Sequence, residues 1–371
     1  MSSATISKGR VLVTGINGFI GVHVARALNE RGYTVMGAVR HESKTVRLQR
    51  LLPQAVASGS LTFGIVPDIA KPGALLPQAV ASGSLTFGIV PDIAKPGAFD
   101  EILSSEQPFD AVVHVGSPIS FAPEDVERDV YQPAIEGTLG ILRSIKACAP
   151  SVKRVIITSS FVAVADRSKG ARPGYVYSEE DWSPVTREQG LENMRMGYTA
   201  SKILAEKAAW NFVETERPSF TITTLCPPFV YGPADQVTSV RDLNESIAQI
   251  YAVFEGKTLM PISGYVWVDV RDIALAHVLA IESTAAAGQR YLIAGGKYSP
   301  QQVIDFIWGN YAERAKEKNI SKGTPGNLWP EGDVFDVDTT KSQRDLGLKY
   351  RPFEECLSDT FSRIVELESE A

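Results

Sequence analysis

The stretch Val11-Leu-Val-Thr-Gly-Ile-Asn-Gly-Phe-Ile-Gly21 decides how most of the chain folds. Its apolar first residues predict a buried strand, and glycines at 15, 18 and 21 predict a turn into a helix. The first glycine of such a turn lets the chain bend sharply, the second lets the backbone approach a pyrophosphate, and the third lets the helix pack on the sheet. The helix N-terminus then faces the phosphates. The stretch therefore predicts a dinucleotide site.

The flanking sequence supports this interpretation. An amphipathic helix follows the turn, and residues 34–39 predict a second strand. The turn residues expected to face the dinucleotide are Gly15, Asn17, Gly18, Phe19, Ile20 and Gly21.

Length and composition set the class of protein. With 371 residues, the chain can form one large nucleotide domain and a smaller second domain. The net charge is −6 and no dense basic block occurs, so we expect a small-molecule partner rather than nucleic acid or a membrane. No apolar run is long enough to span a bilayer and the first ten residues lack a secretion signal, so we expect a cytoplasmic protein. We also expect this protein to be a monomer or a homodimer. Three separated cysteines suit reduced thiols better than disulfides or a metal site.

The end of the second strand bears on the choice of cofactor. An NAD site usually places an acid there for the ribose 2′-hydroxyl, whereas a 2′-phosphate needs cations. Here Arg40 follows the strand and Lys44 lies in the next turn, with no acid at the strand end. These two residues favour NADPH over NADH, although a solvated basic pair at a helix start is the alternative.

A tandem duplication comes next: residues 51–74 recur letter for letter as residues 75–98. Each copy carries one strand and one Asp-Ile pair, and only one copy fits the third position of the sheet. Two identical copies do not make a repeat fold, since a solenoid needs more repeats. We favour the second copy for the third strand, because it leads directly into the helix near Phe99; the first copy, with Asp68, is the alternative.

Strands and helices alternate beyond the duplication, which predicts an α/β fold with a doubly wound parallel sheet. Residues 111–115 and 154–158 read as strands, and both end in small polar residues, including Ser159 and Ser160. Further along, Tyr198 and Lys202 are four residues apart and share one helix face. The carboxyl ends of the strands should form the pocket.

These motifs together resemble the extended short-chain dehydrogenases/reductases. Thr14-Gly15-x-x-Gly18-x-x-Gly21, Thr158-Ser159-Ser160, Tyr198-x-x-x-Lys202 and Pro227-x-x-Val230-x-Gly232-Pro233 stand in the order of that family. Within it the chain is most similar to the branch of plant dihydroflavonol reductase and yeast methylglyoxal (isovaleraldehyde) reductase. The resemblance covers roughly residues 9–365, apart from one copy of the repeat.

The resemblance implies a Rossmann domain over residues 1–233 and a smaller substrate domain over residues 234–371 that also completes the sheet. It implies catalysis by Ser160, Tyr198 and Lys202. It further implies cofactor contacts by Arg40, Lys44, Asp92, Ile93, Tyr198, Lys202 and Val230.

Two positions depart from the family pattern. Ile135 and Glu136 stand where many sugar-nucleotide members carry an Asn, and Ala165 stands where the plant reductase carries a substrate-binding Asn. A flavonoid substrate is therefore not expected.

The remaining sequence concerns the substrate. The aromatic residues Phe121, Phe161 and Phe229 follow strand ends and are expected to line the pocket, whereas Trp267 and His277 are expected in the core. We expect NADPH-dependent reduction of an aldehyde or ketone. The alternatives are a nucleotide-sugar epimerase or dehydratase and a non-catalytic NADPH-binding regulator.

The first prediction concerns Arg40. A charge-assisted hydrogen bond contributes about 1.5–3 kcal/mol, so Arg40→Ala should weaken NADPH binding roughly ten- to a hundredfold. NADH binding, which needs no cation there, should hardly change. Titration of both cofactors against parent and variant tests this, and an equal loss for both would contradict the assignment.

Overall fold

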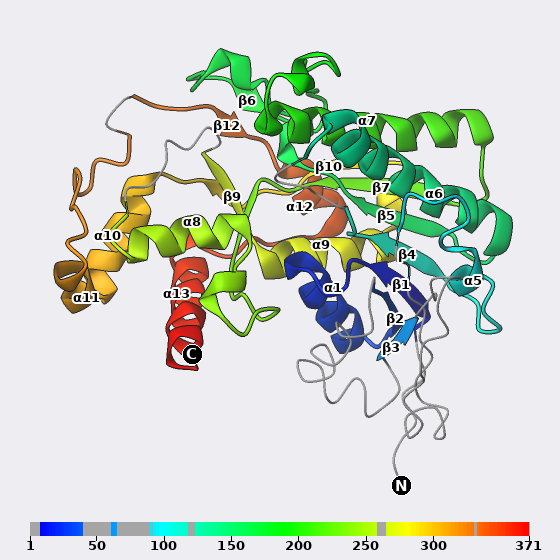
Figure 1. Ribbon diagram of the computed structural model, residues 1–371, viewed down its shortest axis with the longest axis horizontal. Helices are drawn as coiled ribbons and strands as arrows, with labels where there is room; N and C mark the ends of the chain where they lie inside the picture. The colour runs from blue at the N-terminus through cyan, green and yellow to red at the C-terminus, as the bar shows by residue number, and fades with distance from the viewer. Residues whose placement is uncertain are drawn as a thin grey trace, which may run out of the picture.

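The computed structural model shows a parallel sheet with helices on both faces, and a smaller part beside it that is built mainly from later residues (Figure 1). It describes residues 8–39, 61–64, 90, 92–117, 123–257, 265–329 and 332–370, with backbone alone for residues 61–64. Among these residues, no helix is both long and apolar enough to cross a bilayer.

The main sheet has seven strands in the order β10-β7-β5-β4-β1-β2-β3, and every pair is parallel. Its strands are β1 (Arg10–Thr14), β2 (Thr34–Ala38), β3 (Leu61–Gly64), β4 (Ala111–His114), β5 (Arg154–Thr158), β7 (Thr221–Cys226) and β10 (Arg290–Leu292). The chain runs from β1 to one edge and then returns to build the other side from β4 onward. The predicted doubly wound sheet is confirmed, and its switch point lies between β1 and β4.

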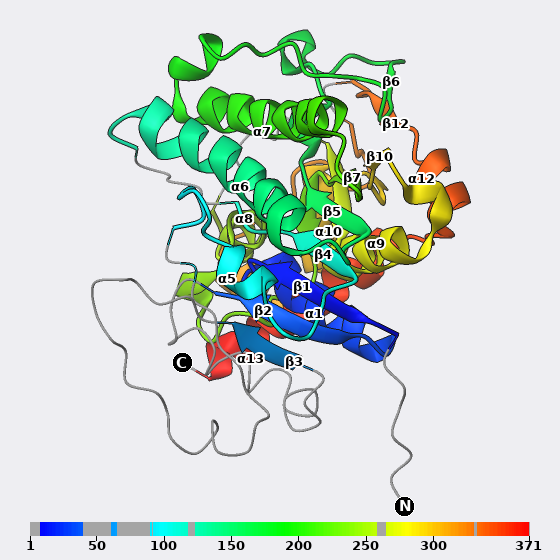
Figure 2. The same ribbon diagram turned by 90° about the vertical axis from the view of Figure 1, so that its right-hand side faces the viewer.

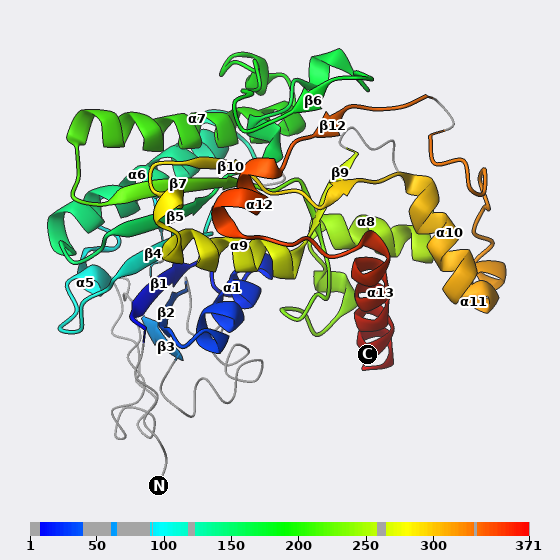
Figure 3. The same cartoon turned by 180° about the vertical axis from the view of Figure 1, so that it is seen from behind.

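Helices cover both faces of this sheet (Figures 2 and 3). One face carries α5 (Asp100–Leu103), α6 (Gln132–Cys148) and α7 (Met194–Glu216). The opposite face carries α1 (Phe19–Glu30), α9 (Val270–Glu282) and α12 (Thr340–Leu346). Because both faces are covered, the central strands are buried, as all four residues of β4 are.

The smaller part contains a three-stranded sheet, β11-β9-β8, and a group of helices. Its elements are β8 (Phe229–Tyr231), α8 (Glu245–Phe254), β9 (Val266–Asp269), β11 (Gly296–Lys297), α10 (Pro300–Asn310), α11 (Ala312–Glu317) and α13 (Phe353–Ser369). A two-stranded sheet, β6 (Val176–Tyr177) with β12 (Asp336–Val337), was not expected from the sequence. Ser299 and Gln302 form the capping box that starts α10.

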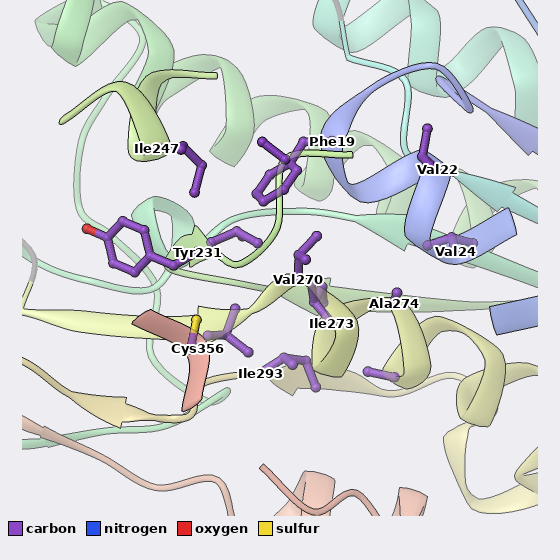
Figure 4. Close-up of a cluster of buried hydrophobic side chains, with 14 of the residues drawn as sticks. Phe19, Val22, Val24, Tyr231, Ile247, Val270, Ile273, Ala274, Ile293 and Cys356 are labelled. Carbon is purple, nitrogen blue, oxygen red and sulfur yellow. The ribbon is translucent and has the colours of Figure 1, made fainter. Parts of the chain in front are cut away.

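Two elements after residue 233, α9 and β10, pack into the first part, where β10 forms one edge of the main sheet. The division into two domains at residue 233 stays a prediction. The core shows the same continuity (Figure 4), since Phe19 and Val22 of α1 share one apolar cluster with Ile273 of α9, Tyr231 and Ile247. Trp267 and His277 are 2% and 0% exposed, which confirms their expected place in the core.

The duplicated segment contributes both of its copies to one sheet position. The third strand comes from the first copy, since Leu61–Gly64 pairs in register with residues 35–38 of β2, so the expectation that the second copy supplies it is wrong. The second copy also reaches this edge of the sheet, because the Val90 N–H donates to the carbonyl of Val39, the residue after β2, at 3.0 Å. Val90 stands one repeat of 24 residues after Val66 in the sequence.

Removing one repeat should leave the fold intact. Deletion of residues 51–74 or of residues 75–98 yields the same polypeptide, in which the strand and Val90 become continuous. Lengthening a loop costs only about 0.6 kcal/mol per doubling, so the shortened chain should have similar or slightly higher stability. Thermal unfolding and NADPH titration of the deletion variant test this. Loss of folding or of cofactor binding would show that both copies are needed.

Candidate active site

The glycine turn leaves β1 in a conformation that excludes side chains. Gly15 has a φ of +67°, and a Cβ there would lie 2.7 Å from the Gly116 backbone. A Cβ on Gly21 would collide with the Gly15 carbonyl oxygen, so glycine is required where α1 crosses the strand end. Gly18 caps α1 without a side-chain hydrogen bond, and no acidic residue occupies the first turn. The N-terminus of α1 can therefore receive an anion.

The end of β4 lies against this turn. The Gly116 N–H donates to the Thr14 hydroxyl oxygen at 3.2 Å, and His114 Nδ1 lies 2.9 Å from the same oxygen. Burial lowers the pKa of His114 to about 4, with Lys202 adding to the effect, so its ring is neutral near pH 7. Sequence analysis did not single out His114.

Ser160, Tyr198 and Lys202 come together at the carboxyl end of β5. Ser160 follows the strand and caps a short 3-10 helix, Phe161–Ala163, and its hydroxyl acts on Tyr198 by favouring a lower pKa of the phenol. Lys202 lies one turn further along α7, with its Nζ 5.8 Å from the centre of the Tyr198 ring. The structure therefore brings the three predicted residues into one group, at the same edge of the sheet as the glycine turn.

Tyr198 is surrounded by charges that the sequence did not reveal. Burial raises the pKa of Tyr198, Glu245 acts in the same direction, and Ser160 and Arg167 act against them. Arg167 lies in the loop after Ser160, and Glu245 begins α8. No described carboxylate forms an ion pair with Arg167. The tyrosine hydroxyl therefore stays protonated at neutral pH and has a cation in its surroundings.

Lys202 is 9% exposed and lines a cavity of about 20 Å³. Burial lowers the pKa of Lys202 to about 8, and Glu206 opposes this effect. Besides Lys202, the polar walls of the cavity come from His114, Ser117, Thr138, Thr158, Ser159 and Glu206. Thr138 is the wall residue that comes from α6. It lies close in sequence to Ile135 and Glu136, which stand where many sugar-nucleotide members of the family carry an Asn. A separate hollow of about 640 Å³ between α6 and α7 shares no residue with this site.

Three other predicted cofactor contacts are described, Asp92 and Ile93 near α6 and Val230 in β8. Ile93 lies against Gly137, where a Cβ would be 2.7 Å from its side chain, and the preceding Asp92 accepts a hydrogen bond from the Ala94 N–H. Val230 is 8% exposed, and its carbonyl accepts from the Ser246 hydroxyl at 2.7 Å. Their cofactor roles remain predictions. Arg40, Lys44 and Asp68 lie outside the described residues.

The aromatic residues differ from one another in position. Phe161 is 3% exposed and packs among Tyr177 and Phe335, with ring centres 5.8 and 5.9 Å away. It therefore belongs to the core and not to the pocket wall that we expected, because its 3-10 helix turns inward after Ser160. Phe229 is partly buried and stacks on Tyr231. Phe121 lies outside the described residues.

Comparison with known proteins identifies the family. Residues 11–294 match the NAD dependent epimerase/dehydratase family, which covers more than half of the chain. The chain belongs to this family. As a member it contains the expected glycine turn, the serine at the end of β5 and the tyrosine and lysine of α7, so the family resemblance inferred from the motifs is confirmed.

Several relatives of this chain are reductases. A ketoreductase of Aspergillus niger is 34% identical, with 96% of this chain and 98% of that protein covered. The NADPH-dependent methylglyoxal reductase of Saccharomyces cerevisiae is 33% identical, with 96% and 98% covered. The crystal structure of yeast methylglyoxal/isovaleraldehyde reductase complexed with NADPH superposes with a TM-score of 0.82, at 31% identity, and covers 98% of this chain and all of that one.

Proposed function

We propose that this protein is an NADPH-dependent carbonyl reductase that converts an aldehyde or ketone into the alcohol. The observation that carries the proposal is the grouping of Ser160, Tyr198 and Lys202 on the same sheet edge as the glycine turn, in which Ser160 acts on the pKa of Tyr198 and Lys202 lies one turn away. The family name covers epimerases and dehydratases, whereas relatives at about one-third identity include a ketoreductase and an NADPH-dependent methylglyoxal reductase.

The residues of the glycine turn fit a dinucleotide. Gly15 and Gly21 allow the close approach of backbone segments, and α1 presents uncapped N–H groups with no acid in its first turn. We assign cofactor contacts to Gly15, Asn17, Gly18, Phe19, Ile20, Gly21, Arg40, Lys44, Asp92, Ile93, Tyr198, Lys202 and Val230. Arg40 and Lys44 would distinguish NADPH from NADH, as the sequence indicates.

Each residue of the triad has a task in this reaction. NADPH, when bound, supplies the hydride that reduces the carbonyl carbon. Tyr198 donates its proton to the carbonyl oxygen, and the raised pKa of Tyr198 ensures that the proton is present. Ser160 donates a hydrogen bond that orients the carbonyl oxygen and stabilises the charge that develops on it. Lys202 holds a positive charge beside Tyr198 and binds the nicotinamide ribose.

The substrate side is proposed to lie in residues 234–371 and the adjoining loops. Phe229 and Phe121 are the aromatic side chains that we retain as substrate contacts, and they favour an apolar carbonyl compound over a sugar nucleotide. We further propose a cytoplasmic monomer or homodimer. The three free cysteines fit a reducing compartment.

Tyr198→Phe tests the assignment of the proton donor. The variant keeps the ring packing and removes the hydroxyl, so kcat should fall at least about a hundredfold while NADPH affinity stays nearly unchanged. Lys202→Ala should lower both turnover and cofactor affinity. Initial rates and cofactor titrations provide the measurements. Near-normal turnover in Tyr198→Phe would refute the triad.

The pH dependence follows from Lys202. With a pKa of about 8, this lysine is protonated at neutral pH and loses its charge as the pH rises. The kcat/KM for carbonyl reduction should therefore be flat between about pH 6 and 7 and decline about tenfold per unit well above pH 8. Initial rates with NADPH and one carbonyl substrate over this range test the prediction. A plateau that extends to about pH 10 would contradict it.

A further inference from the structure

Glu206, four residues after Lys202 on α7, forms a buried ion pair outside the triad. Its carboxylate is paired with Arg290 of β10, with 2.8 Å from Arg290 Nε to Glu206 Oε1 and 3.3 Å from Nη2 to Oε2. Glu206 is 2% exposed and Arg290 is 8% exposed. The Ser159 hydroxyl donates to Glu206 Oε2 at 2.6 Å. One carboxylate therefore joins α7, β10 and the end of β5.

Such a pair is not explained by stability. Removing two charges from water costs several kcal/mol per ion, and apolar residues of similar volume often stabilise a fold as well or better. A buried ion pair does, however, impose one geometry on the groups around it, because each oxygen and each N–H needs a partner.

The same network holds the chain on both sides of Ser160. Glu206 binds the hydroxyl of Ser159, the residue immediately before it. Arg290 Nη2 donates to the carbonyl of Ala163, the last residue of the 3-10 helix that Ser160 caps, at 3.3 Å. Arg290 Nη1 donates to the carbonyls of Glu179 and Asp181, at 2.7 and 2.6 Å. The position of the Ser160 hydroxyl thus depends on the ion pair.

We propose that Glu206 is a positioning residue of the active site, which, through Ser159 and Arg290, fixes the Ser160 hydroxyl toward Tyr198. This inference rests on the proposed carbonyl reductase function. Glu206 acts on the site through these neighbours and does not touch the substrate.

Glu206 has a second effect, on the charge of Lys202. The two side chains line the same cavity, and the carboxylate raises the pKa of Lys202 against the effect of burial. The other titratable groups near Lys202 and Glu206, besides Arg290, are Tyr198, His114 of β4 and Cys226 of β7. His114 is neutral, and burial raises the pKa of Cys226 so that its thiol stays protonated. Lys202 is therefore the group whose titration should respond to the charge of Glu206.

Two variants separate positioning from charge. Ser159→Ala removes the hydrogen bond from the end of β5 to Glu206 and leaves every charge in place. The kcat should therefore fall about tenfold, with KM and the pH profile unchanged. Glu206→Gln also removes the negative charge, so its kcat should fall further and the alkaline decline of kcat/KM should move to lower pH. Trp210→Phe is the matched control: its indole N–H lies 3.5 Å from Glu206 Oε1, and its loss should change neither quantity.

Parent and variants are compared by initial rates with NADPH and one carbonyl substrate, by NADPH titration and by thermal unfolding. If Glu206→Gln does not fold, Ser159→Ala still decides, since a kcat within twofold of the parent overturns the positioning role. A folded Glu206→Gln with an unshifted pH profile overturns the effect on Lys202. If the parent shows no NADPH-dependent turnover, the proposed function fails and this inference with it, whereas an active parent with unchanged variants overturns the inference alone.

Discussion

The contact between the Gly15 carbonyl and the Gly21 backbone is the constraint on which the rest of the structure depends. It lets α1 cross the end of β1 so closely that no side chain fits between them. The N-terminal end of the helix, where its dipole is positive, then lies at the carboxyl edge of the sheet, where β4 and β5 also end. Ser160 reaches this edge from the end of β5, and Tyr198 and Lys202 reach it from α7.

Burial acts differently on the ionisable side chains at the site: two histidines are neutral near pH 7, whereas Lys202 keeps its positive charge. His114 and His277 are buried, and burial lowers the pKa of each to about 4, so they serve as neutral hydrogen-bonding partners of Thr14 and Thr158. Lys202 is also buried, yet a carboxylate on the next turn opposes its loss of charge. In surroundings of low polarity, the positive charge of Lys202 interacts more strongly with nearby groups than it would in water. A proton donor beside it, such as Tyr198, is therefore more strongly affected by that charge.

Sequence reasoning found the parts of the site that depend on local pattern. The glycine turn, the strand ending at Thr158 and the spacing of Tyr198 and Lys202 are local, and the structure confirms the elements that carry them. Phe161 was misplaced because the direction of a 3-10 helix after a strand depends on its packing against Tyr177 and Phe335.

The residues that sequence reasoning missed act over long separations. Arg290 meets Glu206 across 84 positions, and no spacing rule connects them. Glu206 does follow Lys202 at helical spacing, so a signal for one half of the pair was present. Arg167 and Glu245 reach Tyr198 from a loop and from a helix start, and only the folded chain brings them there.

The duplicated segment has a consequence for how the chain is made. Both copies have identical sequences, so the side chains of the strand itself cannot distinguish one copy from the other. Order of appearance can. At a synthesis rate of about 5–20 residues per second, the second copy follows the first by roughly 1–5 s, whereas small β-structures form in microseconds. The first copy can therefore pair with β2 before the second copy has been synthesised, so the order of synthesis distinguishes two segments that are identical in sequence.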